Sequence, residues 1–138
     1  SMSREQLIGL IASDAKFMGE REDISAYVRG LRAGEGLSED AIRAGYETFK
    51  KDKAARALAG LAERHGLAVE ALTAFVDAVM ARRIFDGEAL TDLLSPLELG
   101  WKARAQKEGE LMAELAPLLR KRAAGREIAG LRAWEDAR

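Results

Sequence analysis

The chain has no cysteine among its 138 residues. It therefore cannot form a disulfide, supply a thiolate nucleophile or hold zinc through sulfur, and it suits the reducing cytosol. No apolar run approaches the roughly 18 residues that cross a membrane, and no signal-peptide pattern opens the chain. We expect a cytoplasmic protein with no membrane partner. We interpret residues 1–2 as a cloning remnant and the rest as an excised domain.

Motifs for catalysis and for nucleotide binding are also absent. The chain contains no G-x-x-x-x-G-K-[ST], no G-x-G-x-x-G after a strand, no H-E-x-x-H and no calcium-binding loop. Its only histidine, His65, has no nucleophile motif or ligand cluster beside it, so we interpret it as a helix-end residue rather than a catalytic base. No carboxylates are paired in a setting that separates their pKa values. We predict no catalytic residue, no metal site and no cofactor in this chain.

The composition favours one helical domain. Apolar residues make up 48% and charged residues 33% of the chain, which suits a folded protein better than a disordered one. Residues 1–99 carry 13 basic and 17 acidic side chains, whereas residues 100–138 carry 9 and 6. The basic excess near the end is a weak signal for nucleic acid, because a domain built for phosphate contacts is usually basic overall.

Apolar spacing predicts an all-α fold, a single compact bundle of about six to eight helices with no sheet, over residues 3–138. Ser3 should cap a first helix that ends near Phe17, and a second helix should follow Asp23. We expect a loop at residues 32–36 and a third helix that opens at Ser38.

The third helix has an apolar stripe that changes direction. Ile42, Tyr46 and Phe49 share one face, whereas Leu58 and Leu61 are displaced by roughly a third of a turn. This displacement predicts a bend or break after residues 50–53. The helix should end at His65 with Gly66 as its left-handed cap.

The second half shows several local helix signals. A clean amphipathic stripe follows Val69, and Asp86 should cap a short helix. In the run S-P-L-E, Ser95 as cap predicts a helix that starts at Pro96. Pro117 predicts a kink or a restart. After Gly125 as C-cap, a last segment should pack on the body through three apolar residues: Ile128, Leu131 and Trp134.

Charged residues interrupt the apolar stripe of the Pro96 helix. Arg104 and Glu108 lie one turn apart inside the apolar sector. They either bury only their stems and carry their charges to an edge, or form an ion pair at a subunit interface. Trp101 lies on the same stripe, where it is either a core residue, an interface anchor or a stacking platform.

Several short strings, in this order, resemble a known family: I-F-D-G-E from Ile84, L-S-P-L-E-L-G-W-K-A-R, E-L-M-A-E-L-A-P-L-L and G-R-E-I-A-G-L. The chain resembles the C-terminal region of the motor (restriction) subunit of type I restriction-modification enzymes. The likeness is close over roughly the last sixty residues and loose over the first eighty.

The resemblance implies a non-catalytic assembly domain that docks the motor subunit on the methyltransferase and specificity subunits. It also implies a parent protein that is an ATP-dependent type I deoxyribonuclease, with its ATP and magnesium sites in other domains. One alternative is direct contact with DNA, and another is a helical scaffold or regulatory module of a different system.

Two groups of residues are candidates for binding. The partner-binding candidates are Trp101, Lys102, Arg104 and Glu108. The candidates for DNA binding are Lys107, Arg120, Lys121, Arg122 and Arg126, although a run of cations at a helix end is more often a solvated surface. Arg82 and Arg83 with Asp86 form a third cluster, for which local pairing and binding stay equally open.

Overall fold

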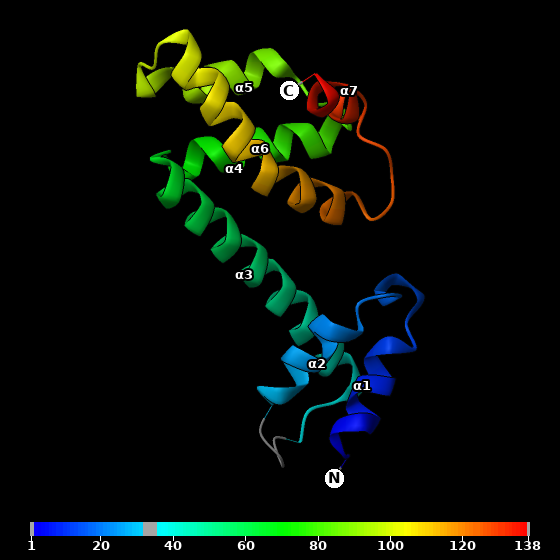
Figure 1. Cartoon of the computed structure of the whole chain (residues 1–138). Helices are drawn as coiled ribbons and strands as arrows, with labels where there is room; N and C mark the ends of the chain where they lie inside the picture. The colour runs from blue at the N-terminus through cyan, green and yellow to red at the C-terminus, as the bar shows by residue number, and fades with distance from the viewer. Residues whose placement is uncertain (1, 32–35, 138) are drawn as a thin grey trace. The chain divides into compact units, whose positions relative to one another are not determined.

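The computed structural model describes residues 2–31 and 36–137, and within these ranges it contains seven α-helices and no strand (Figure 1). The predicted all-α class is confirmed. The helices are α1 (Arg4–Ala12), α2 (Arg21–Arg29), α3 (Glu39–His65), α4 (Val69–Arg82), α5 (Gly87–Leu94), α6 (Trp101–Ala123) and α7 (Leu131–Asp136). Of the loop predicted at residues 32–36, all but Gly36 lie outside the described residues. In the described part of the chain, no helix combines the length and apolarity of a membrane span.

The helices belong to two compact units, Ser1–Arg56 and Ala57–Arg138, and each has its own apolar core. The N-terminal unit contains α1, α2 and the first part of α3. The C-terminal unit contains the end of α3 and α4 to α7. That residues 3–138 form one domain stays a prediction.

In the N-terminal unit, Ser3 caps α1 as predicted. Its hydroxyl accepts a hydrogen bond from the Gln6 amide at 3.2 Å, and the Gln6 side chain accepts one from the Ser3 amide at 2.7 Å. The helix ends at Ala12, earlier than predicted, because Asp14 then caps a 3₁₀ turn, η1 (Ala15–Phe17).

The core of this unit forms around Tyr46 on α3. Tyr46 is fully buried, its ring meets that of Phe17 edge-on at 4.9 Å, and its hydroxyl donates to Glu20 at 2.6 Å. Burial, followed by the bond to Glu20, raises the pKa of Tyr46 above its ordinary value. The other buried core residues are Ile8, Ile11, Phe17, Ile24, Val28 and Ile42.

Of the predicted bend or break in α3, the break is wrong, because the helix continues from Glu39 to His65. The displacement of its apolar face has another cause. Ile42 and Tyr46 lie in the N-terminal core, whereas Leu58 and Leu61 lie in the C-terminal core. Each face therefore packs into a different core.

The C-terminal unit is built around the apolar faces of α4, α5 and α6. The predicted stripe of α4 is buried at Leu72, Phe75, Val76 and Val79. Asp86 caps α5 as predicted, and its carboxylate accepts from the Glu88 amide at 2.9 Å. Ile128 and Leu131 are buried, and Trp134 packs against the same core, so the predicted packing of the last segment is confirmed.

The segment between α6 and α7 is held to the segment between α4 and α5. The Phe85 amide donates to the Ala129 carbonyl at 2.8 Å, and the Ala129 amide donates to the Arg83 carbonyl at 2.8 Å. These two bonds form an isolated parallel bridge between Ile84 and Ala129. They fix the residues that precede α7.

The predicted helix start at Pro96 is also wrong, since α6 begins at Trp101. Ser95 has helical backbone angles and continues from α5, and its hydroxyl donates to the Asp92 carbonyl at 2.9 Å instead of capping a new helix. Pro96 lies in a 3₁₀ turn, η2 (Ser95–Leu97). Glu98 then adopts a left-handed conformation, and Gly100 is the N-cap of α6.

Pro117 does not restart α6, which continues to Ala123. Both Pro117 and Ala113, whose carbonyl loses its helical donor, are exposed. This position lies on the solvent side of the helix, where a carbonyl that lacks its helical donor can be hydrated. The C-cap of α6 is Ala124, which takes the left-handed conformation, and not the predicted Gly125. Gly125 follows it with φ 84°.

Candidate partner-binding surfaces

The indole of Trp101 faces solvent at the first position of α6. It is 71% exposed, and the ammonium of Lys102 lies 5.3 Å from its ring centroid. The interpretation of Trp101 as a core residue is therefore wrong. Trp101 is the first residue of α6, and the buried stripe of the helix starts at Glu108, two turns later.

Glu108 lies inside the C-terminal unit with 7% exposure, beside the buried Leu111 and Met112. Its predicted position in the apolar sector is confirmed. Arg104 is half-buried. Of the four partner-binding candidates, Trp101, Lys102 and Arg104 thus reach solvent, whereas Glu108 is buried among the residues of its own unit.

Among the DNA-binding candidates, Arg120, Arg122 and Lys107 have acidic partners, and Lys121 is also engaged within the chain. Arg120 forms two hydrogen bonds with Glu135, which raise the pKa of Arg120. Arg122 lies 4.0 Å from Asp77, and Lys107 lies 3.8 Å from Glu110.

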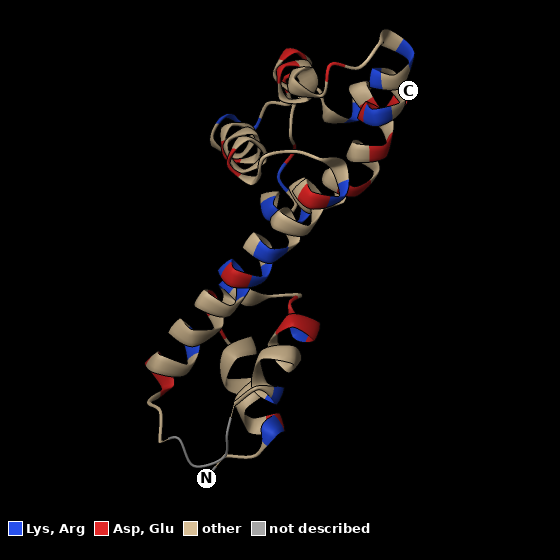
Figure 2. Ribbon diagram, turned by 90° about the vertical axis from the view of Figure 1, so that its left-hand side faces the viewer, with Lys and Arg blue, Asp and Glu red and all other residues tan. Residues whose placement is uncertain are grey.

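Figure 2 shows both signs of charge interspersed along α3. Arg126 is exposed and has no acidic partner in the described part of the chain.

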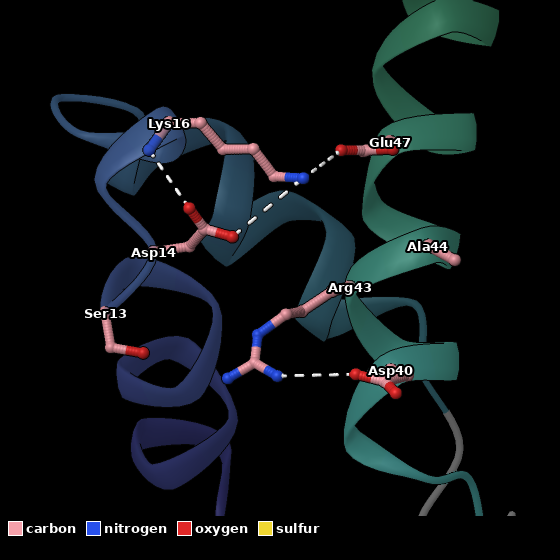
Figure 3. A pocket seen from close by; sticks show the side chains of 7 residues that line it. All are labelled: Ser13, Asp14, Lys16, Asp40, Arg43, Ala44 and Glu47. Carbon is pink, nitrogen blue, oxygen red and sulfur yellow. Dashed lines mark hydrogen bonds and ion pairs between the residues drawn. The ribbon is translucent and has the colours of Figure 1, made fainter.

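A hollow of about 470 Å³ opens in the N-terminal unit between η1 and α3 (Figure 3). The Lys16 ammonium lies 2.8 Å from Glu47 and 3.9 Å from Asp14, and Arg43 lies 3.9 Å from Asp40. The hydrogen bond between Lys16 and Glu47 raises the pKa of Lys16 and lowers that of Glu47. Each cation of this hollow already has an acidic partner. Sequence spacing could not reveal it, because Lys16 and Glu47 come from different elements.

A second hollow, of about 460 Å³, lies in the C-terminal unit between the end of α6 and α7. Two of its arginines, Arg120 and Arg126, were predicted binding residues, whereas Arg132 was not. The apolar spacing marked Ile128 and Leu131 only as core. The full lining is Arg120, Gly125, Arg126, Glu127, Ile128, Leu131 and Arg132.

Arg82 and Arg83, the third predicted cluster, lie at the end of α4. Arg83 is the left-handed cap of α4, with φ 57°, and one of its guanidinium nitrogens is buried without a hydrogen-bond partner. Asp86 uses its carboxylate to cap α5. Among the described residues, no ion pair joins Asp86 to either arginine.

His65 ends α3, as predicted, with Gly66 left-handed at φ 68°. It is 8% exposed, and its Nε2 lies 2.5 Å from the Glu114 carboxylate of α6. The other Glu114 oxygen accepts from Arg64 at 2.7 and 3.1 Å. The bonds from His65 and then Arg64 lower the pKa of Glu114. This cluster joins two helices of one unit, and its histidine Nδ1 is buried without a hydrogen-bond partner.

The described residues contain no group of three or more His, Cys, Asp or Glu side chains placed to hold a metal ion. The groups that the C-terminal unit presents to solvent include the indole of Trp101 and several guanidinium groups, which are residue types suited to binding. The fold defines an all-α protein whose C-terminal unit exposes a tryptophan and several arginines.

The family described as "Type I restriction and modification enzyme - subunit R C terminal" matches residues 1–122. The chain belongs to this family, as its sequence motifs predicted. Neither a curated protein nor a solved structure matches it.

Proposed function

We propose that this domain docks the R subunit of a type I restriction-modification enzyme on its core of methyltransferase and specificity subunits. The exposed Trp101 carries this proposal. A large aromatic side chain loses favourable burial when it faces water, and Trp and Arg are enriched among the residues that dominate binding energy at interfaces. Trp101, Lys102 and the half-buried Arg104 form a surface of this composition, the Trp101 surface.

The Trp101 surface is supported by a rigid base. Leu111 and Leu115 of the same helix are fully buried in the C-terminal core. Binding through a fixed helix end loses little conformational entropy, so more of the contact energy appears as affinity.

In this proposal the chain binds and does not catalyse. The nuclease and the ATP-driven translocase, with the ATP and magnesium that they need, belong to other domains of the R subunit. The domain holds the nuclease and the translocase on the complex that recognises the DNA site.

The test compares variants of the chain for binding to the purified methyltransferase core by isothermal titration calorimetry. Trp101→Ala should weaken binding by about tenfold or more, since central aromatic residues typically contribute over 1.4 kcal/mol. Arg104→Glu should weaken it as well. Met18→Ala is the matched control, because Met18 is 80% exposed and lies in the N-terminal unit. Unchanged affinity of Trp101→Ala, with unchanged circular dichroism, removes the Trp101 surface from the proposal.

Direct contact with DNA is a second candidate, supported by the unpaired Arg126 and by the excess of basic residues after residue 99. The pairing of Arg120, Arg122 and Lys107 with acids makes assembly the better supported function. DNA binding by this chain would weaken with salt, with a log–log slope of about −0.9 per phosphate contact. A flat salt dependence, or no binding at low salt, excludes this candidate.

A further inference from the structure

The hollow between α6 and α7, here called the arginine pocket, combines an apolar floor with a cationic rim. Ile128 and Leu131 are buried and form the floor. Arg120, Arg126 and Arg132 line the rim, together with the single acid Glu127. The rim has an excess of positive charge.

Two arginines of the rim are available to a ligand. Arg126 and Arg132 are exposed, and among the described residues neither forms an ion pair or a hydrogen bond through its side chain. Arg120 is different, because Glu135 already holds its guanidinium. In the hollow of the N-terminal unit, by contrast, Lys16 and Arg43 are both held by acids.

The walls of the arginine pocket are fixed before any ligand arrives. The backbone bonds of Ala129 to Arg83 and Phe85 hold the segment before α7, and Gly130 lies so close to Phe85 that an added Cβ would be 3.3 Å from its carbonyl oxygen. The bond between Arg120 and Glu135 joins α6 to α7. A preformed pocket binds with a lower entropic cost.

We propose that the arginine pocket binds an acidic segment of a partner protein. A carboxylate of that segment pairs with Arg126 and Arg132, and a neighbouring apolar side chain covers the floor at Ile128 and Leu131. Planar guanidinium groups bind carboxylates with two parallel hydrogen bonds, which makes such pairs strong and geometrically selective. If the domain docks as proposed above, the segment belongs to the methyltransferase core.

The floor distinguishes a peptide from DNA. Nucleic-acid backbones are bound mainly through cations that reach phosphates, and this contact does not require a recessed apolar surface. A side chain that enters a concave apolar site gains from burial.

The first experiment uses a defined probe and does not depend on the docking function. The ¹⁵N-labelled chain is titrated with N-acetyl-Leu-Glu amide and, as control, with N-acetyl-Leu-Gln amide. We expect saturable shifts of the amides of residues 125–132 with the glutamate peptide. The glutamine peptide should bind at least about tenfold more weakly, because the charged pair is lost. Equal shifts with both peptides, or none, overturn the proposal. Shifts produced by a DNA duplex and not by the glutamate peptide overturn it in favour of nucleic acid.

The second experiment measures binding to the methyltransferase core. The double variant Arg126→Glu with Arg132→Glu should bind at least about tenfold more weakly than the wild type. Its control is Arg4→Glu with Arg29→Glu, which makes the same change of charge at two exposed arginines of the N-terminal unit.

Its outcomes separate the two proposals. Suppose that Trp101→Ala loses binding to the methyltransferase core, whereas the Arg126 and Arg132 variant binds fully. This result supports docking and overturns the proposal that the arginine pocket contacts the core. No binding of the wild type, with saturable peptide shifts, overturns docking and supports the pocket.

Discussion

Substituting Gly45 with alanine should destabilise the N-terminal unit, although alanine is the better helix former. An added Cβ at Gly45 would overlap the hydroxyl oxygen of Tyr27 and lie 3.2 Å from its Cζ. That hydroxyl donates to the Ile42 carbonyl at 3.1 Å. The Tyr27 ring also packs against Tyr46 at 5.7 Å and Phe49 at 5.6 Å, so it cannot move away without losing contacts.

The two opposing effects have known sizes. Replacing glycine by alanine inside a helix gains about 1 kcal/mol. Forcing an extra carbon into a packed site typically costs about 1–3 kcal/mol, and losing the Tyr27 hydrogen bond costs about 1 kcal/mol more. The net result for Gly45→Ala should be a loss of about 1–3 kcal/mol in the free energy of unfolding.

Gly109→Ala is the matched control, because nothing lies within 4 Å of an added Cβ in the middle of α6. This variant should be about 1 kcal/mol more stable than the wild type. Urea denaturation followed by circular dichroism at a fixed temperature measures both. Trp101 and Trp134 both lie in the C-terminal unit, so tryptophan fluorescence separates the response of that unit.

The prediction depends on the sign of the difference between the two variants. If Gly45→Ala gains as much stability as Gly109→Ala, Tyr27 does not pack against α3 at Gly45. The described core of the N-terminal unit would then be incorrect.

Two further substitutions test the C-terminal unit. Glu114→Gln should remove part of the acid dependence of stability: the folded pKa of Glu114 is lowered, so its stabilisation is present above its ordinary pKa of 4.5 and is lost as the pH falls through the folded value. Urea midpoints between about pH 7 and pH 3 measure this, and an identical pH profile in the variant contradicts the role of the bonds from His65 and Arg64. Leu111→Ala should cost about 2–5 kcal/mol, because Leu111 is fully buried and the change leaves a cavity. A cost below about 1 kcal/mol in urea denaturation, followed by tryptophan fluorescence, would place Leu111 outside a packed core.

Signals that act within one helical turn were read correctly from the sequence. Ser3 and Asp86 cap their helices, and Gly66 ends α3, because each effect depends on a side chain and the nearest amides or on local backbone freedom. The apolar faces of α4 and of the later part of α6 were predicted for a similar reason. A helical period marks the buried side wherever a helix packs against one core.

Signals whose meaning depends on distant contacts were misread. Ser95 and Pro96 suit the start of a helix and equally suit a 3₁₀ turn that extends α5. Leu97 packs against the C-terminal core and lies close to Gly66, a tertiary contact that local patterns do not contain. Because α6 does not start at Pro96, Trp101 is its first residue and is not part of its buried stripe.

The charged run in α3 shows why a displaced apolar face does not require a break. Lys50 lies 2.9 Å from Glu20, with its ammonium 4.7 Å from the ring centroid of Phe17, and Lys53 donates to Asp23 at 2.6 Å. These lysines hold the first part of α3 to the rest of the N-terminal unit through charge and aromatic contacts, where apolar residues are lacking.

The residues that follow the charged run carry the helix onward. Residues 54–57 are Ala-Ala-Arg-Ala, which favour a helix without burial. The helix then reaches Leu58, where the second core begins. A shift of apolar phase across a run of strong helix formers therefore indicates a change of core rather than the end of a helix.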